Sequence, residues 1–426
     1  MAIAVARFGG IGVIHRFLSI ADQAALVSRV KRHQGHVIID PVTIAPDATI
    51  LDARALMASR GISGLPVISR KGLLLGIITT RDTTLADDRS TVAERMTTSA
   101  KLVTASPDIS MDAAREILSA SRLEKLPLVD AVGKLAGLIT ARDLVAATSP
   151  ATSGATRDEA GRLRVAAAVG VAGDYIDRAK TLADAGADAL VIDIAHGDSE
   201  LMLNAVSALR EHLGDIPLIA GNVATAEATR RLAEAGVDAV KVGVGPGSIC
   251  ITRQVAGVGV PQFTAVMECA EVGHEFNIPI VADGGIRYPG DVSKAIGAGA
   301  SSVMLGSIIA GTEESPGAVI SRGGRKMKMV RGMASREAAL FRRLRENPSA
   351  PAVEWEDSEE TSADEGVQAP VPYRGRADEI LTELLGGLRS GMSYCDAHDI
   401  PTMWKNARFV RQTPAGQTES GSHDVG

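Results

Sequence analysis

The sequence predicts an α/β protein: a (β/α)8 barrel of the TIM type that lacks its first strand and carries an inserted tandem module. Three observations predict this fold. Apolar runs of strand length alternate with helix-length segments over most of the chain, and this alternation is typical of right-handed βαβ units in a parallel sheet. Polar or glycine residues follow the strands, as at the carboxyl-end rim of a barrel, where active sites lie. An internal repeat interrupts the pattern between residues 42 and 146.

Strand-like runs are the first element of the prediction. They are IGVIH (11–15), LRVAAAVG (163–170), ADALVIDIA (187–195), IPLIAGNV (216–223), DAVKVGVG (238–245), IPIVADGG (278–285) and SSVMLGS (301–307). Rim positions follow at His196, Asn222, Gly243, Asp283 and Gly306. A closed barrel of this type has eight strands. Because the chain opens with a helix-like segment, AIAVARFGG, the first strand is expected to be missing upstream.

Helix-length segments such as YIDRAKTLADAG and TAEATRRLAEAG separate the strands, and each ends in glycine, a common C-terminal stop. The predicted barrel comprises residues 1–38, with the second strand and its helix, and residues 149–426. Within the latter, a flap is expected at about 334–370 and a tail at 395–426. Residues 351–370 of the flap are acidic and bounded by prolines. Long loops of this kind are often functional lids.

The inserted module is predicted at residues 39–148, with repeats at about 42–100 and 101–148. Four pairs share the same 61-residue spacing: Pro46 and Pro107, Asp47 and Asp108, Pro66 and Pro127, and Asp82 and Asp143. A constant offset over four markers indicates a true repeat. Each repeat is expected to form a strand, an amphipathic helix, two strands and a closing helix near T-x-R-D.

The repeat pair resembles a tandem of cystathionine-β-synthase-type (CBS) domains. That resemblance implies a regulatory purine nucleotide in the cleft between the repeats. The residues expected near its ribose are Thr79, Asp82, Thr140 and Asp143. The alternative is that these aspartates only cap helices.

Composition excludes several classes of function. With 45% hydrophobic and 23% charged residues and a net charge of −6, the chain has no electrostatic footprint for nucleic acid. Its longest apolar runs are too short to cross a membrane, and its N-terminus lacks the basic region of a signal peptide, so a cytoplasmic protein is expected. Cys250, Cys269 and Cys395 are too widely spaced for a disulfide framework or a structural zinc site.

Two loops at the predicted rim carry chemistry. In GVGPGSICITR, glycines permit close backbone approach to a ligand, and a partly exposed Cys250 beside backbone N–H groups can act as a nucleophile. The alternative is an inert small apolar residue. In VADGGIR, Asp283 can accept hydrogen bonds from a ribose diol, and the loops after the last two strands are the usual phosphate site of such barrels. The alternative for this second loop is a simple turn.

Several long motifs, in this order, resemble the IMP dehydrogenase and GMP reductase family over essentially the whole chain. They are GVGPGSICITRQVAGVGVPQ, VADGGIR, GSIIAGTEESPG, VRGMAS, GGLRSGMSY and ESGSHDV. The resemblance implies that the Cys250 thiolate adds to C2 of the purine, that hydride passes to NAD, and that water cleaves the resulting thioimidate. It implies that Thr252 relays a proton.

The resemblance also assigns binding residues. For the nucleotide, IMP or GMP, they are Ser248, Asp283, Gly284, Gly285, Gly306, Ser307, Gly332, Met333 and Glu365. For the dinucleotide they are Asp193, Gly243, Val244 and Gly245. A potassium ion would be held by Gly245, Gly247 and Cys250, completed by Glu419 and Ser420 of a neighbouring subunit in a homotetramer.

Features of the sequence favour different members of this family. IMP dehydrogenases carry an Arg-Tyr pair in the flap, and none occurs between Arg331 and Tyr373; the segment FRRLREN offers Arg342, Arg343 and Arg345 instead. DIAHG (193–197) and Val330 also depart from the IMP dehydrogenase pattern. These departures favour GMP reductase, which uses the same cysteine with NADPH to expel ammonia from GMP. The long flap, the GTEESPG loop and the ESGSHDV tail favour IMP dehydrogenase, the predicted function, in guanine nucleotide biosynthesis.

A third alternative is a non-catalytic nucleotide sensor, in which the CBS pair binds the ligand and the barrel is a degraded scaffold. The missing first strand favours it, although a start codon placed too far downstream explains that gap as well. The joint presence of Cys250, Thr252, Asp283 and Glu365 argues against it.

Overall fold

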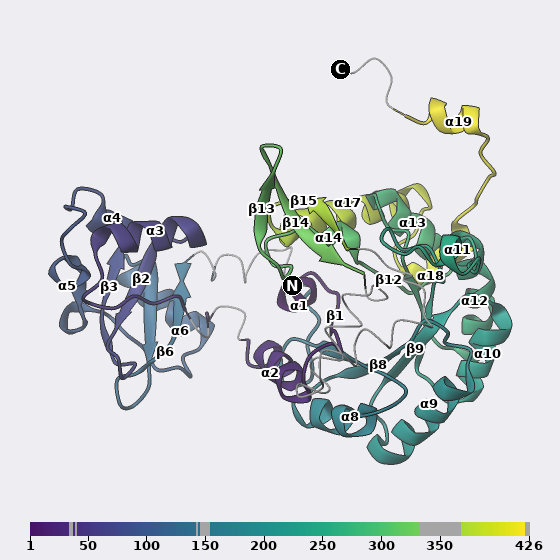
Figure 1. Cartoon of the computed structure of the whole chain (residues 1–426), viewed down its shortest axis with the longest axis horizontal. Coiled ribbons are helices and arrows are strands. Elements are labelled where there is room, and N and C mark those ends of the chain that lie inside the picture. Colours follow the sequence, from purple (N-terminus) through teal and green to yellow (C-terminus); the bar gives the residue numbers. More distant parts are fainter. Residues whose placement is uncertain (34–36, 39–40, 142–143, 145–153, 333–367, 422–426) are drawn as a thin grey trace, which may run out of the picture. The chain divides into compact units, whose positions relative to one another are not determined.

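The computed structural model describes residues 1–426 except 34–36, 39–40, 142–143, 145–153, 333–367 and 422–426 (Figure 1). The chain forms two compact units, one of Met1–Lys31 with Arg164–Gly426 and the other of Arg32–Leu163. The predicted module, 39–148, lies inside the second unit. Across the described ranges, no helix is both long and apolar enough to cross a membrane.

The first unit is built on a parallel seven-stranded sheet. Its strands are β1 (Gly12–Ile14), β7 (Val165–Val169), β8 (Ala189–Asp193), β9 (Leu218–Val223), β10 (Ala239–Val242), β11 (Ile280–Asp283) and β12 (Ser302–Met304), adjacent in this order. All seven predicted strands are confirmed. The sheet curls into an arc with helices on its outer side (Figure 1). Parallel strands therefore end along one edge, which brings the predicted rim residues together.

Helices alternate with these strands, as predicted. They are α8 (Tyr175–Asp184), α9 (Glu200–Leu213), α10 (Ala226–Glu234), α12 (Gln262–Phe276) and α13 (Pro289–Gly297). Side-chain oxygens of Ser199 and Thr225 cap the first turns of α9 and α10 by accepting backbone N–H groups. Buried side chains of β7 and β8 pack together in one cluster, which includes Ala166, Ala168 and Val191.

The segment that precedes the inserted unit in the chain also belongs to this sheet. Helix α1 (Ala2–Arg7) precedes β1, and α2 (Ile20–Lys31) follows it. Gly12 of β1 lies opposite Val165 of β7 in the parallel register. The fully buried Gln23 of α2 donates its amide to the carbonyls of both Ile14 and Ala168, at 3.0 and 2.9 Å. This side chain therefore links β1 and β7 within the first unit.

A smaller antiparallel sheet follows the last parallel strand. After α14 (Ser307–Ala310) come β13 (Val319–Arg322), β14 (Arg325–Arg331) and β15 (Gln368–Pro372). Arg331 of β14 lies opposite Gln368 of β15, so the two strands that flank residues 332–367 are paired with each other. The predicted flap, 334–370, lies outside the described residues except 368–370, which form part of β15 rather than loop. Helices α17 (Ala377–Tyr394), α18 (Ile400–Asn406) and α19 (Pro414–Glu419) complete the unit.

The second unit contains the two repeats. The first has α3 (Ile50–Arg60), β2 (Gly64–Ile68), β3 (Leu74–Thr79), α4 (Thr80–Thr83), α5 (Val92–Arg95) and β4 (Thr97–Thr98), followed by the 3-10 turn η1 (Ser99–Lys101). The second has α6 (Met111–Ala120), β5 (Lys125–Val129) and β6 (Leu135–Thr140). Each expected leading strand is only a single bridge, Ile44 to Val67 and Ala105 to Leu128. Each repeat buries its own apolar cluster, around Leu65 in the first and Leu126 in the second.

Candidate active site

The loop after β10 places a cysteine beside a threonine at the carboxyl end of the sheet. A Cβ atom at Gly243 would lie 2.0 Å from the carbonyl oxygen of Asp283, so only glycine fits where β10 and β11 end. The Cys250 N–H donates to the carbonyl of Gly247 at 3.1 Å. The Cys250 Sγ lies 3.1 Å from Oγ1 of Thr252, the first residue of α11 (Thr252–Val255). The predicted nucleophile and the predicted proton relay are therefore within hydrogen-bond distance.

Hydroxyl groups from two different loops meet next to this pair. Ser248 Oγ donates to Ser307 Oγ at 2.5 Å, which joins the loop after β10 to the start of α14. Gly306 is the N-terminal cap position of that four-residue helix. Gly284 and Gly285 follow β11 with φ angles of +97° and +83°, a region open to glycine but rarely to other residues. The structure thus gathers all five of these predicted nucleotide-binding residues at one edge.

The first unit contains a cavity of about 410 Å³ at this edge, and the second unit contains one of about 390 Å³. The cavity in the first unit is lined in part by Ser248, Gly284 and Gly285. Three cationic side chains, Arg253, Arg287 and Lys294, and the carboxylate of Asp291 line it as well. A cavity with glycine backbone, a hydroxyl and an excess of positive charge is suited to an anionic ligand.

The most buried charge at this edge is Lys241, in the middle of β10. Its Nζ donates to Asp193 Oδ1 at 2.9 Å, to Asp283 Oδ2 at 3.0 Å, and to Asn222 Oδ1. Burial alone would lower the pKa of Lys241, but the charges of Asp283 and Asp193 outweigh it and raise the pKa above its usual value. The ammonium is therefore charged at neutral pH. The sequence prediction missed this residue, although a lysine inside the apolar run DAVKVGVG was a visible signal.

The amino-acid sequence and the fold match one family over nearly the whole chain. A family model described as the IMP dehydrogenase / GMP reductase domain matches residues 1–423. The chain belongs to the IMP dehydrogenase / GMP reductase family. The resemblance predicted from the motifs is confirmed.

Members of the IMP dehydrogenase / GMP reductase family from distant organisms share about half of this sequence. Inosine-5'-monophosphate dehydrogenase of Nitrosopumilus maritimus (strain SCM1) is 49% identical over 425 residues, covering 100% of this chain and 88% of that protein. The enzyme of the same name from Aquifex aeolicus (strain VF5) is 48% identical, covering 100% and 86%. Among solved structures, a GMP reductase variant from Trypanosoma brucei in complex with guanosine 5'-monophosphate is 44% identical with a TM-score of 0.74, covering 100% of this chain and 88% of that one.

Other residues implied by membership of the IMP dehydrogenase / GMP reductase family lie elsewhere or are not described. Gly332 directly follows β14, whereas Met333 and Glu365 lie outside the described residues. Glu419 ends α19 and Ser420 is its C-terminal cap position; Ser420 Oγ donates to the carbonyl of Gly416 at 2.9 Å. Within the described ranges, no group of three or more His, Cys, Asp or Glu side chains could hold a metal ion. Three of the predicted potassium donors, Gly245, Gly247 and Cys250, would instead offer backbone carbonyls of one glycine-rich loop, a donor type that potassium accepts in proteins.

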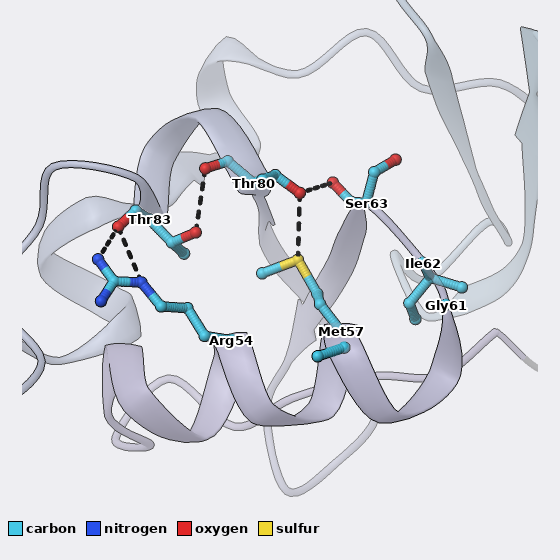
Figure 2. Close-up of a pocket in the computed structure, with 8 residues that line it drawn as sticks. Arg54, Met57, Gly61, Ile62, Ser63, Thr80 and Thr83 are labelled. Carbon is cyan, nitrogen blue, oxygen red and sulfur yellow. Dashed lines mark hydrogen bonds between the residues drawn. The ribbon is translucent and has the colours of Figure 1, made fainter.

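The second unit of this family member has a cavity of its own in the first repeat (Figure 2). It is lined by Arg54, Met57, Ala58, Gly61, Ile62, Ser63, Thr80 and Thr83. The Arg54 guanidinium donates to the carbonyl of Thr83 and forms an ion pair with Asp88, and Thr80 Oγ1 donates to the carbonyl of Ser63 at 3.3 Å. The cavity wall is thus held together by hydrogen bonds between α3 and the segment after β3.

Of the predicted nucleotide residues of the second unit, Thr79 and Asp82 are sequence neighbours of Thr80 and Thr83, which line this cavity, but neither belongs to the lining itself. Asp82 Oδ2 accepts from the backbone N–H and the hydroxyl of Thr79, at 2.8 and 2.7 Å, which forms the capping box of α4. Thr140 ends β6, and Asp143 lies outside the described residues. The helix-capping alternative therefore describes the contacts of Asp82.

Proposed function

We propose that this protein is an IMP dehydrogenase, which oxidises IMP to XMP with NAD through a covalent intermediate on Cys250. The observation that carries the proposal is the 3.1 Å approach of Cys250 Sγ to Thr252 Oγ1, in a loop that only glycine can build beside Asp283. Relatives that are nearly half identical and bear the name inosine-5'-monophosphate dehydrogenase support it.

The residues of the chain supply a nucleophile and a proton path. The Cys250 thiolate forms a bond to C2 of the purine, and the hydride at C2 leaves for the nicotinamide of NAD. Water then attacks C2, the carbon–sulfur bond breaks, and XMP and the thiol are released. The Thr252 hydroxyl, at hydrogen-bond distance from the sulfur, takes up and returns protons during these steps.

The binding roles follow the geometry of the edge. The hydroxyls of Ser248 and Ser307 would hold the phosphate of IMP together with the backbone of Gly284, Gly285 and Gly306, and Asp283 would accept hydrogen bonds from the ribose. Gly332, Met333 and Glu365 would contact the purine. Asp193, Gly243, Val244 and Gly245 would face the dinucleotide.

A potassium ion and a second copy of the chain belong to this proposal. Carbonyls of Gly245, Gly247 and Cys250 would hold the ion, and Glu419 and Ser420 of a neighbouring subunit in a homotetramer would complete its shell. Bound there, potassium would fix the conformation of the loop that carries the cysteine. We place the enzyme in the cytoplasm, with the sheet as part of a (β/α)8 barrel.

The second unit, on this proposal, is a tandem of CBS domains that binds a regulatory purine nucleotide. The 61-residue repeat, the matching bridges at Ile44 and Ala105, and the cavity near Arg54 support it. Thr79, Asp82, Thr140 and Asp143 remain the residues predicted near the ribose.

GMP reductase is the second candidate function. It is favoured by Ile194 and Ala195, where IMP dehydrogenases usually have serines, and by the similarity of the Trypanosoma brucei GMP reductase structure. In that reaction NADPH delivers hydride to the purine and ammonia leaves, so no hydrolytic step is needed.

Steady-state turnover separates the candidates. The protein is incubated with IMP and NAD, and separately with GMP and NADPH, while the absorbance of the reduced dinucleotide is followed. We expect turnover in the first mixture. Turnover only in the second would establish GMP reductase, and turnover in neither would favour the nucleotide sensor.

Replacing Cys250 tests the chemistry itself. Cys250→Ala should abolish turnover while IMP binding, measured by calorimetry, persists. Cys395→Ala is the matched control, since Cys395 caps the end of α17 and is also only partly buried; it should leave turnover unchanged. Residual activity of the Cys250 variant above a few per cent of wild type would contradict covalent catalysis.

A further inference from the structure

We propose that Lys241 is a positioning residue that couples the binding of the two substrates, because one buried ammonium orients both Asp193 and Asp283. The inference rests on the proposed function, in which Asp283 holds the nucleotide ribose and Asp193 faces the dinucleotide. It adds a residue that touches neither ligand and links the two sites.

Four adjacent strands build this link. Asp193 ends β8, Asn222 lies in β9, Lys241 lies in β10 and Asp283 ends β11. The Lys241 Nζ has three hydrogens and three acceptors: Asp193 Oδ1, Asn222 Oδ1 and Asp283 Oδ2. No hydrogen of the ammonium is left for a ligand, so Lys241 acts through the carboxylates.

The two aspartates, unlike the lysine, are open to ligands. The Lys241 side chain is 3% exposed, whereas those of Asp193 and Asp283 are 29% and 26% exposed. Asp283 Oδ2 also accepts from Asn222 Nδ2 at 3.0 Å. Within the described part of the chain, the side-chain hydrogen bonds of both carboxylates fall on one oxygen each, and the second oxygen, Asp193 Oδ2 or Asp283 Oδ1, can accept from a ribose hydroxyl.

The shared ammonium makes the two carboxylates dependent on each other. A ligand that orders Asp283 also fixes the ammonium against Asp193, so the next ligand meets a carboxylate that is already oriented. The coupling must be reciprocal: bound nucleotide raises the affinity for the dinucleotide by the same factor by which bound dinucleotide raises the affinity for the nucleotide. Without the ammonium, the two carboxylates repel each other and lose the group that orients them both.

Equilibrium binding to Cys250→Ala protein tests the inference, because hydride transfer cannot then occur. The dissociation constant of IMP is measured by calorimetry with and without saturating NAD, and that of NAD with and without IMP. With Lys241 present, each ligand should lower the dissociation constant of the other about tenfold. Adding Lys241→Met should weaken both ligands and bring the coupling factor close to one; Lys241→Gln carries the same expectation and serves if the methionine variant fails to fold.

Conservative and distant controls separate positioning from a structural role. Lys241→Arg keeps the charge and should retain coupling within about threefold of wild type. Lys180→Met, the same change at an exposed position of α8, should change nothing.

Two results would overturn the inference: a Lys241→Met variant that weakens only one ligand, or one that weakens both but keeps the wild-type coupling factor. Failure of the proposed function would be detected by a different measurement, the turnover of unmodified enzyme with each substrate pair. If GMP and NADPH are the pair turned over, the same binding cycle is run with them.

Discussion

Asp283 and Asp82 are two aspartates predicted from sequence to face a ribose, and the structure treats them differently. Asp283 is held by Lys241 and Asn222, which come from two other strands. Asp82 is held by the backbone and hydroxyl of Thr79, three residues earlier. The hydrogen bonds of Asp82 are therefore made within one turn of the chain, whereas those of Asp283 need side chains from two other strands of the sheet.

The difference teaches which aspartate serves stability. A capping box satisfies backbone N–H groups at a helix start and stabilises a helix by about 1 kcal/mol. A buried ion pair such as Asp283 with Lys241 adds little net stability, since desolvation opposes its attraction. A cluster of that kind is better explained by what its partly open carboxylate can bind.

The largest expected effect is on Asp283→Asn. The variant should lower kcat/KM for the nucleotide by about 100-fold, because hydrogen bonds to a charged group contribute about 1.5–3 kcal/mol each. Its thermal midpoint should stay within a few degrees of wild type, since asparagine has the same shape and still accepts from Lys241. Steady-state kinetics and thermal unfolding check the two halves.

Asp188→Asn is the matched control for that prediction. Asp188 pairs with the buried Lys31 at 2.8 Å and also accepts from the backbone of Val165, away from the strands' carboxyl ends. The loss of the Asp188 carboxylate should lower the thermal midpoint and leave kcat/KM for the nucleotide unchanged. A kcat/KM for the nucleotide in Asp283→Asn that stays within threefold of wild type would erase the contrast with Asp82.

A smaller effect is expected for Asp82→Ala. Loss of the α4 cap should lower the unfolding free energy of the second unit by about 1 kcal/mol, with no change in kcat/KM in the absence of a regulatory nucleotide. Asp52→Ala removes the same kind of capping box, with Thr49, from α3. Urea unfolding of both variants should show lowered midpoints; loss of ATP or GTP binding confined to Asp82→Ala would instead give that aspartate a ligand role.

The smallest effect is a pH dependence at Asp52. Hydrogen bonds from the Thr49 side chain and backbone hold the pKa of Asp52 below its usual value. Because the folded pKa is depressed, the contribution of Asp52 to stability is present above the unfolded pKa of about 3.9 and is lost as pH falls through the folded pKa. The midpoint difference between wild type and Asp52→Asn should therefore be widest near pH 7 and become smaller as the pH falls below the unfolded pKa of about 3.9. A constant difference would show that the charge is irrelevant to the cap.

Much of the fold could be predicted because hydrophobic period and strand length are local properties. All seven strands were found, but each is shorter in the structure, as where the expected 301–307 run yields β12 at Ser302–Met304 and Ser307 starts α14. The leading strands of the repeats were expected and proved to be single bridges at Ile44 and Ala105. An extended segment becomes a strand only through its partner, which periodicity does not reveal.

The site was predictable where its residues are neighbours in the chain. Cys250 and Thr252 are two positions apart, so their contact follows from one loop. The contact of Ser248 with Ser307 joins loops after two different strands, and sequence could only place both at the same edge. Lys241 was missed because a charged residue in an apolar strand acquires meaning only from the acceptors that other strands bring to it.

The pairing of β1 with β7 has a consequence for how such a gene can change. These strands lie on either side of the inserted unit in the chain, yet they pair directly, and Gln23 ties them from α2. Removing Arg32–Leu163 would leave every strand pair of the seven-stranded sheet in place. In the topology of the sheet, the second unit is a long connection between β1 and β7. Recombination can therefore add, exchange or delete this unit as a block without changing the order of strands that builds the candidate site.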